Sequence, residues 1–356
     1  MKRIRLDNAE FEGENVVYVL DDGEETALID VGAASGVVRT DLREGLAELG
    51  VGFADVDTIL LTHWHYDHCG LAGEIQAASG ATVYAHEADA ALIAGERRSA
   101  FDDPEQRTER LTEWGMPAAD REALASFVDG HMDLAGESVA VTTVTDGETL
   151  SVAGVDLTAC HLPGHAAGLV AYCASHDQLA ATRGDDTVPD VELSGADEQE
   201  AAFVGDVILP RYTPNVGGAD LRLSEPLADY VDSLVRLADR DPAVAYPGHR
   251  DPIRDPADRA REILTHHRDR TRRVLDTLAE RGPATPWAVS AALFGDLDGI
   301  HILHGPGEAY AHLAHLAAAG VVERRGRQYA LVADPETVDV AGLFPVADDT
   351  ADHETG

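Results

Sequence analysis

Basic residues are scarce in this chain of 356 residues, and lysine is almost absent. Lys2 is the only lysine, and the 27 lysines and arginines together face 65 acids, which gives a formal net charge of −38. The acid excess runs along the whole chain, so we expect it to be an adaptation to a salt-rich cytoplasm, where a Debye length of about 3 Å at 1 M salt screens self-repulsion. At low salt the same charge repels nucleic-acid phosphates.

Cysteines and long apolar segments are scarce as well. The three cysteines show no framework spacing, which excludes a disulfide scaffold and is typical of a reducing compartment. No run approaches the roughly 18 apolar residues of a membrane span, and no apolar segment follows Met1–Arg5 as in a secretory signal. We therefore expect a cytoplasmic protein with no membrane partner.

The first part of the chain alternates strands with helices. Short apolar runs bounded by turn residues predict the strands, and longer amphipathic runs predict the helices between them. This order favours an α/β architecture with two sheets flanked by helices. The predicted strands are 15–20, 26–30, 58–61, 82–85, 138–144, 149–152, 155–160 and 168–173, and the predicted helices are 38–49 and 71–79. A polar helical insertion follows at about 87–132, and we expect an acidic, solvated loop at about 183–202.

The C-terminal part has a different pattern. Helices are predicted at 259–281, 285–294 and 308–319, and a hairpin that turns at Gly326 follows at 321–331. Three helices and a β-hairpin are typical of a winged helix. The predicted domains are thus 1–254 and a winged-helix-like 255–332, followed by an acidic tail at 333–356.

The most informative segment follows the apolar strand 58–61. His63, His65, Asp67 and His68 lie within six residues of one another, in the turn after a buried strand. Neutral imidazole nitrogens suit zinc, and a carboxylate among them adds charge and an oxygen ligand. Three histidines and an aspartate in this pattern predict a metal site.

Further candidate ligands recur at strand ends. Pro-Gly turns place His165 after the strand 155–160 and His249 after the apolar run 243–246, while Asp206 ends the run 202–205. A tight Pro-Gly turn projects the next side chain from the rim of a sheet. Each signal alone is weak, but together they indicate convergence on one rim.

His-x-His-x-Asp-His at 63–68, then Pro-Gly-His, Gly-Asp and Pro-Gly-His in that order, resemble the metallo-β-lactamase-fold hydrolases over roughly residues 5–252. The resemblance implies an αββα sandwich with two divalent metal ions at one edge, zinc first, with iron or manganese as alternatives. It implies that His63, His65 and His165 bind the first ion, that Asp67, His68 and His249 bind the second, and that Asp206 bridges both. The C-terminal module resembles the lactamase-beta-2-like branch of the glyoxalase-II-related group.

The chemistry of two such ions is hydrolysis. Two divalent ions that share a carboxylate leave room for a bridging water of lowered pKa, whose hydroxide attacks a carbonyl or phosphoryl centre. Asp67 is the candidate catalytic residue that orients this nucleophile. Asp30, at the end of the strand 26–30, is a candidate for bracing the ligands. Tyr66 replaces a small residue of the motif, and it either reaches the substrate or covers the rim.

Three functions remain open from the sequence. The first is a binuclear-metal hydrolase of thioesters or other acyl esters, similar to glyoxalase II. The second is a phosphodiesterase or endoribonuclease of the lactamase-beta-2-like type, with RNA as its partner. The third is a metal-bound, ligand-sensing regulator whose winged helix binds DNA; the arginines of 259–281 favour it, but the helix 308–319 carries no arginine or lysine.

Overall fold

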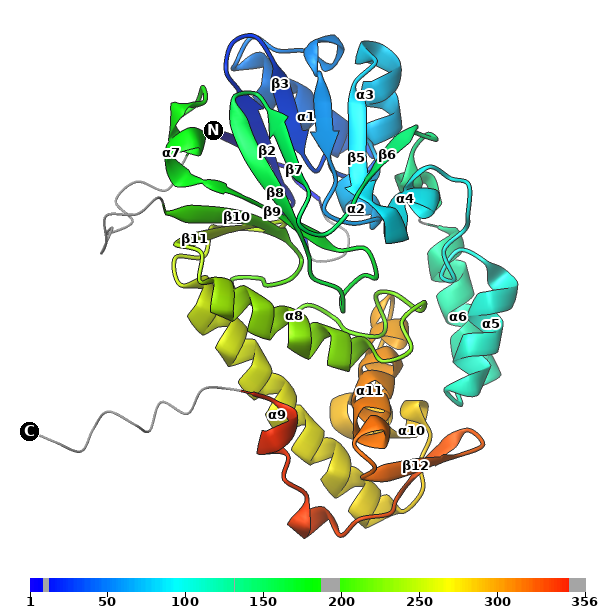
Figure 1. Ribbon diagram of the computed structural model, residues 1–356. Coiled ribbons are helices and arrows are strands. Elements are labelled where there is room, and N and C mark those ends of the chain that lie inside the picture. Colours follow the sequence, from blue (N-terminus) through cyan, green and yellow to red (C-terminus); the bar gives the residue numbers. More distant parts are fainter. Residues whose placement is uncertain (9–12, 131, 187–198, 346–356) are drawn as a thin grey trace, which may run out of the picture.

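The core of the molecule is a pair of β-sheets, seen in the computed structural model that describes residues 1–8, 13–130, 132–186 and 199–345 (Figure 1). The first sheet has the strand order β1-β2-β3-β4-β5-β6, antiparallel from β1 to β3 and parallel from β3 to β6. Its strands are β1 (Lys2–Arg5), β2 (Val16–Asp21), β3 (Thr26–Ile29), β4 (Thr58–Leu60), β5 (Thr82–His86) and β6 (Val141–Val144).

The second sheet has the order β11-β10-β9-β8-β7 and is antiparallel except between β10 and β11. Its strands are β7 (Thr149–Val152), β8 (Val155–His161), β9 (Val170–Ser175), β10 (Glu200–Gly205) and β11 (Val244–Pro247). The strands predicted from the sequence are confirmed, whereas β1 was not predicted.

Alternating side chains of each strand belong to different layers of the core, as the period of two requires. In β2, Tyr18 and Leu20 lie between the two sheets, whereas Val17 and Val19 face the helices. In β10, Phe203 lies between the sheets and Val204 packs on the helix side. Strands that are buried on both faces read as continuous apolar runs, which is why these segments were recognisable.

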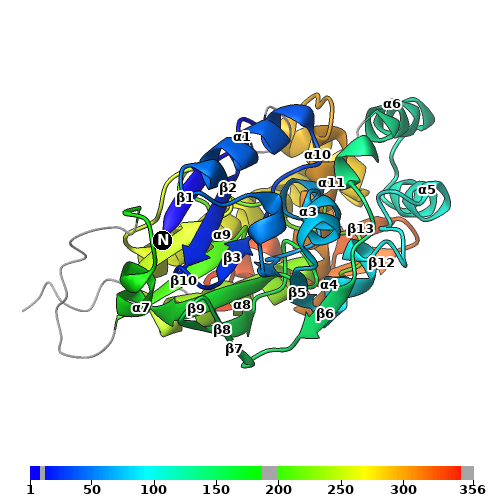
Figure 2. The same ribbon diagram turned by 90° about the horizontal axis from the view of Figure 1, so that it is seen from above.

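Helices cover the outer faces of both sheets. Helices α1 (Gly36–Ala47) and α3 (Ala72–Ser79) cover the first sheet, and Figure 2 shows α1 on the side opposite the second sheet. On the second sheet lie α8 (Pro226–Arg240) and α9 (Pro256–Arg281), and the short α7 (His176–Ala181) follows β9. The expected α/β sandwich is confirmed; helices α7 and α8 were not predicted.

The C-terminal part contains α9, α10 (Pro286–Phe294), α11 (His301–Ala318) and the hairpin of β12 (Val322–Arg325) and β13 (Gln328–Leu331). The prediction that α11 begins at Glu308 is wrong, because the helix begins at His301 and continues through Pro306. Proline lacks a backbone N–H and normally interrupts a helix, but Pro306 lies inside this one. The flanking glycines instead allow close contacts: a Cβ at Gly305 would lie 2.3 Å from Leu297 and one at Gly307 2.2 Å from Gly218.

The helical insertion consists of α4 (Glu87–Ile93), α5 (Pro104–Glu113) and α6 (Ala118–Asp129). Helix α4 packs on β5 and β6, whereas α5 and α6 join the C-terminal module. Leu111, Trp114 and Leu124 share a buried apolar cluster with Ile302 and Leu303 of α11. Parts of the predicted acidic loop and acidic tail, 187–198 and 346–356, lie outside the described residues.

The apolar core continues from the sandwich into the C-terminal module through α8 and α9. Short helices complete the chain at α2 (Tyr66–Cys69), η1 (Phe53–Asp55), η2 (Met132–Ala135), η3 (Pro335–Thr337) and η4 (Ala341–Leu343). Among the described helices, none is both long and apolar enough to span a bilayer.

Candidate metal centre

The seven predicted ligands lie at neighbouring strand ends on one rim of the sandwich. His63 and His65 follow β4, and Asp67 and His68 belong to α2 directly after them. His165 lies in the turn between β8 and β9, Asp206 follows β10, and His249 follows β11. The structure therefore brings together residues from distant parts of the chain.

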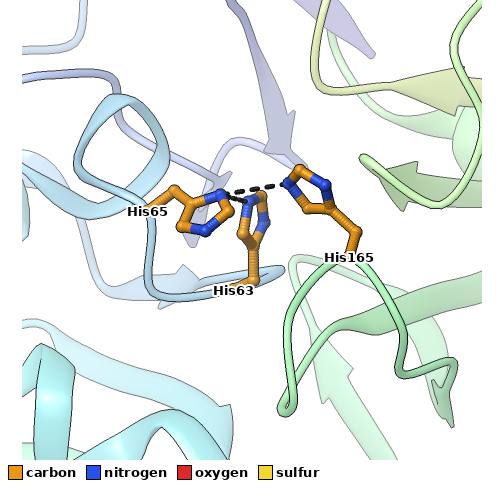
Figure 3. A group of neighbouring side chains, drawn as sticks. All are labelled: His63, His65 and His165. Atoms are coloured by element: carbon orange, nitrogen blue, oxygen red, sulfur yellow. Dashed lines mark hydrogen bonds between the residues drawn. The ribbon is translucent and has the colours of Figure 1, made fainter. Parts of the chain in front are cut away.

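His63, His65 and His165 form the first half of the site (Figure 3). The Nδ1 atom of His65 lies 2.8 Å from Nε2 of His63 and 3.1 Å from Nε2 of His165. All three side chains point toward one another from two separate turns. His63 and His165 are buried, and His65 is half-buried. Three nitrogen atoms thus meet at one point.

Asp67, His68 and His249 form the second half, and Asp206 faces both. Nε2 of His249 lies 3.5 Å from Oδ2 of Asp67 and 3.4 Å from Oδ2 of Asp206. Nε2 of His68 lies 3.7 Å and 3.6 Å from the same two carboxylates. Asp206 Oδ2 is also 3.6 Å from Nε2 of His165, so this carboxylate stands between the two halves.

The ligand separations in the second half fit a metal ion. Ligand atoms about 2.0–2.2 Å from one tetrahedral zinc ion are roughly 3.3–3.6 Å apart, and those of the second half are 3.4–3.7 Å apart. The N···N distances of 2.8 and 3.1 Å in the first half are shorter, so these three nitrogens would move apart slightly to hold an ion. Nε2 of His68, Nε2 of His249 and Oδ1 of Asp206 are buried and have no hydrogen-bond partner among the described residues. A buried polar atom without a partner costs about 1–3 kcal/mol, and three of them around one point are explained by a shared cation.

The hydrogen bonds of the outward-facing ring nitrogens indicate which tautomer the ligand histidines adopt. Nδ1–H of His165 donates to the carbonyl of Asn215 (2.9 Å), and Nδ1–H of His249 donates to that of Gly13 (2.7 Å). In the same way, Nε2–H of His65 donates to the carbonyl of Ala219 (3.0 Å). An imidazole that carries a proton only on its outward nitrogen has its lone pair on the inward nitrogen. The short N···N contacts among His63, His65 and His165 then bring lone pairs face to face, which favours a cation between them.

Asp30 braces the remaining two histidines. Its Oδ2 accepts hydrogen bonds from Nδ1 of His68 (2.8 Å) and from Oγ1 of Thr62 (2.8 Å), and Oγ1 of Thr62 lies 3.0 Å from Nδ1 of His63. The backbone N–H of Thr62 donates to Oδ1 (2.8 Å). This is the bracing position expected for Asp30 from the sequence.

The protonation equilibria differ between the two halves. Burial, together with the neighbouring imidazoles, lowers the pKa of His63 and of His65 well below the ordinary value, so both are neutral and able to bind a metal at pH 7. Burial also acts to lower the pKa of His68 and of His249, but the surrounding carboxylates outweigh it and raise both values. The second half therefore attracts positive charge strongly.

A pocket of about 90 Å³ opens beside these ligands. Aromatic and aliphatic side chains form much of its wall, and α11 of the C-terminal module contributes one side. The lining residues are Trp64, His65, Tyr66, Asp67, Phe101, His165, Asp206, Asn215, Gly218, Ala219, Ile300, His301, Leu303 and His304. The Tyr66 hydroxyl donates to Asp102, so its ring covers the rim while its polar end is held by the insertion.

Several residues that organise the site were not predicted. The segment 215–220 supplies two of the carbonyls that orient ligand histidines, and Asp220 accepts hydrogen bonds from Ala167 N (2.9 Å) and Trp64 Nε1 (3.3 Å). Arg222 pairs with Asp220 and with the buried Asp89. Because the acceptors are backbone carbonyls, the identity of the residues does not reveal them. The sequence indicated only a turn at Asn215-Val216-Gly217-Gly218.

Comparisons with known proteins agree with this geometry. The family model of the metallo-beta-lactamase superfamily matches residues 11–182. The solved structure of a metallo-beta-lactamase family protein from Thermus thermophilus is 30% identical, with a TM-score of 0.72, and the match covers 93% of this chain and 98% of that one.

Two curated relatives extend the comparison. The probable metallo-hydrolase YqjP of Bacillus subtilis (strain 168) is 28% identical over 295 residues, which is 79% of this chain and 81% of that protein. The atrochrysone carboxyl ACP thioesterase of Aspergillus fumigatus is 23% identical over 307 residues, 81% of this chain and 70% of that protein. The fold and the site define a metal-dependent hydrolase. The chain belongs to the metallo-beta-lactamase superfamily.

Proposed function

We propose that the protein hydrolyses thioesters or other acyl esters with two divalent metal ions, in the manner of glyoxalase-II-like enzymes. His63, His65 and His165 would hold one ion, Asp67, His68 and His249 the other, and Asp206 would contact both. The observation that carries the proposal is the convergence of five inward imidazole nitrogens and two buried carboxylates on one point beside a pocket. Zinc suits this set best, since imidazole and carboxylate are its usual ligands.

The bound ions would supply a water of lowered pKa and an electrophile for the carbonyl oxygen. The protein's own side chains do the rest. Asp67 lies on the pocket wall, and although burial raises its pKa, His68 and His249 outweigh burial and lower the value. An ionised Asp67 accepts a hydrogen bond from the attacking water and orients it toward the substrate, while Asn15 Nδ2 donates to Oδ2 (3.2 Å) and fixes the carboxylate.

The pocket wall favours acyl over phosphoryl substrates. Trp64, Phe101, Ile300 and Leu303 offer apolar surface for an acyl group, and among the described residues no arginine or lysine lines this pocket. Two arginines, Arg250 and Arg270, line the adjoining groove of about 540 Å³, where Glu14 and Glu308 respectively neutralise their charges. Because both arginines are already paired, neither offers an unpaired cation to a phosphodiester. The thioesterase among the relatives supports the same choice.

We infer that the C-terminal module, with three helices followed by a hairpin, is a winged helix like that of the lactamase-beta-2-like branch. We assign it a role in shaping the pocket, because the helix that would read a DNA groove, α11, is largely buried and its first turn lines the substrate pocket. This burial disfavours the DNA-binding regulator. RNA cleavage remains the second candidate activity, because a site with two metal ions also suits the hydrolysis of a phosphodiester.

A direct assay separates these activities. Purified protein loaded with zinc in high salt is given short acyl thioesters, activated phosphodiesters and single-stranded RNA. We expect thioester hydrolysis that His63→Ala abolishes and that His176→Ala, a substitution in α7 away from the site, leaves unchanged. RNA cleavage that depends on His63, with no thioester turnover, would reverse the assignment.

A further inference from the structure

The segment 215–220 connects the metal centre to the C-terminal module. From this segment, the carbonyl of Asn215 orients His165 and the carbonyl of Ala219 orients His65. Two ligands of the first half therefore depend on the placement of one loop. Figure 1 shows the first turn of α11 beside the segment that precedes α8, and Asn215 Nδ2 donates to the carbonyl of His304 at 3.2 Å.

Glu308 of α11 holds this loop in place. Its Oε2 accepts hydrogen bonds from Nδ2 of Asn215 (3.1 Å) and from the backbone N–H of Val216 (3.3 Å). The residue is only 4% exposed, so neither bond competes with bulk water. Close backbone contact at Gly218 and Gly307 leaves the loop no room to shift toward α11.

Arg270 of α9 supplies the charge that a buried carboxylate needs. Nη1 of Arg270 lies 2.5 Å from Oε1 of Glu308. His267 and His312 also surround this oxygen, at 3.6 Å and 3.7 Å, and the trio has the spacing of a metal cluster. Since the guanidinium already occupies Oε1 and neutralises the carboxylate, we interpret the cluster as an anchor, with the two histidines filling the buried space around it.

We propose that Glu308 is a positioning residue of the metal centre. It holds Asn215 so that the carbonyl of that residue keeps Nε2 of His165 aimed at the first metal ion. The path runs from Arg270 through Glu308 and Asn215 to His165, and each step is a direct contact between buried or half-buried groups. The C-terminal module thereby becomes part of the metal site. This inference rests on the proposed binding of two ions.

The test measures metal affinity, not turnover. We compare three full-length proteins: the wild type, Glu308→Gln, and the matched control Glu262→Gln on the exposed surface of α9. Each protein is titrated with zinc in competition with a chromophoric chelator, and with cobalt followed by absorption spectroscopy. We expect Glu308→Gln to bind one of its two equivalents 10–100-fold more weakly, roughly the range typical of lost outer-sphere partners. In Glu308→Gln, the absorption spectrum of the more weakly bound cobalt ion changes, while the other ion binds with wild-type affinity. The control variant binds both ions with wild-type affinity.

A second variant distinguishes a positioning role of Glu308 from a folding defect caused by Glu308→Gln. Asn215→Ala keeps the Arg270–Glu308 pair and the bond from the Val216 N–H to Glu308, but it removes the side-chain bond between Asn215 and Glu308. We expect the same metal ion to bind more weakly, and the double variant to bind it no more weakly than the weaker of the two single variants. Wild-type affinity in both single variants, or equal weakening of both equivalents, overturns the positioning role. A wild type that binds two ions without thioester turnover defeats only the proposed function, and a wild type that binds none defeats both.

Discussion

Asp30 illustrates how one residue can organise a metal centre without touching a metal ion. Its backbone lies in the left-handed region at φ 56°, which is unusual for a residue with a side chain. That conformation turns the carboxylate back toward the strand end, where it accepts hydrogen bonds from Thr62 and His68 at once. The strain is held at the end of β3, next to the end of its parallel neighbour β4, which delivers the first ligands.

Removal of this carboxylate should weaken metal binding. We expect Asp30→Ala to lower zinc affinity by roughly 10–100-fold, because His68 and Thr62 lose the acceptor that fixes them. Chelator competition measures the change, with Asp177→Ala in α7 as the control. Unchanged affinity in Asp30→Ala would show that the His68 ring is held by packing alone.

Glu308 predicts a pH dependence of stability. Burial acts to raise its pKa, but Arg270 and the nearby histidines outweigh it and lower the pKa well below the ordinary 4.5. A lowered pKa in the folded state means that the ionised group stabilises the fold above pH 4.5, and this contribution is lost as the pH falls below that value.

This pH dependence is tested by denaturant unfolding. The unfolding free energies of the wild type and Glu308→Gln are measured between about pH 7 and pH 3. The wild type is the more stable protein at pH 7, and the difference in unfolding free energy shrinks below pH 4.5. A difference that stays constant over this range contradicts the ionised, paired state of Glu308.

At the scale of elements, strand ends were predictable and the C-terminal packing was not. Apolar runs followed by His, Asp or Pro-Gly-His located the rim, because parallel strands present their carboxyl ends at one edge. Helix α11 was misplaced at its start because Pro306 lacks a backbone N–H and normally breaks a helix. The role of Glu308 depends on a contact with Asn215, which lies 93 positions away in the sequence, and no local sequence pattern encodes such a contact.

Gly307 tests the packing of α11 against the loop. A Cβ at this position would lie 2.2 Å from Cα and 2.3 Å from N of Gly218, so backbone must move. We expect Gly307→Ala to lower the unfolding free energy by about 1–3 kcal/mol and to weaken metal binding as well. Gly36→Ala in α1, where no described atom lies within 4 Å, is the matched control and gains up to ~1 kcal/mol. Equal stability of the two variants contradicts the close contact.

At the scale of the whole molecule, the charge of −38 dominates. Sixty-five acids against 27 lysines and arginines make the folded chain repel itself at low salt. Screening weakens this repulsion as the Debye length falls from about 10 Å at 0.1 M to about 3 Å at 1 M. We expect the thermal midpoint to rise with added potassium chloride over this range, measured by circular dichroism. A midpoint that is independent of salt argues against adaptation to a salt-rich solvent.

We propose that seven side chains, gathered at the ends of β4, β8, β10 and β11, hold two metal ions. The most direct test is elemental analysis of protein purified without chelators. The wild type is compared with His165→Ala and with His249→Ala. We predict two transition-metal equivalents per wild-type chain and about one in each variant. Wild-type protein that contains no transition metal, even after exposure to zinc, would contradict the claim.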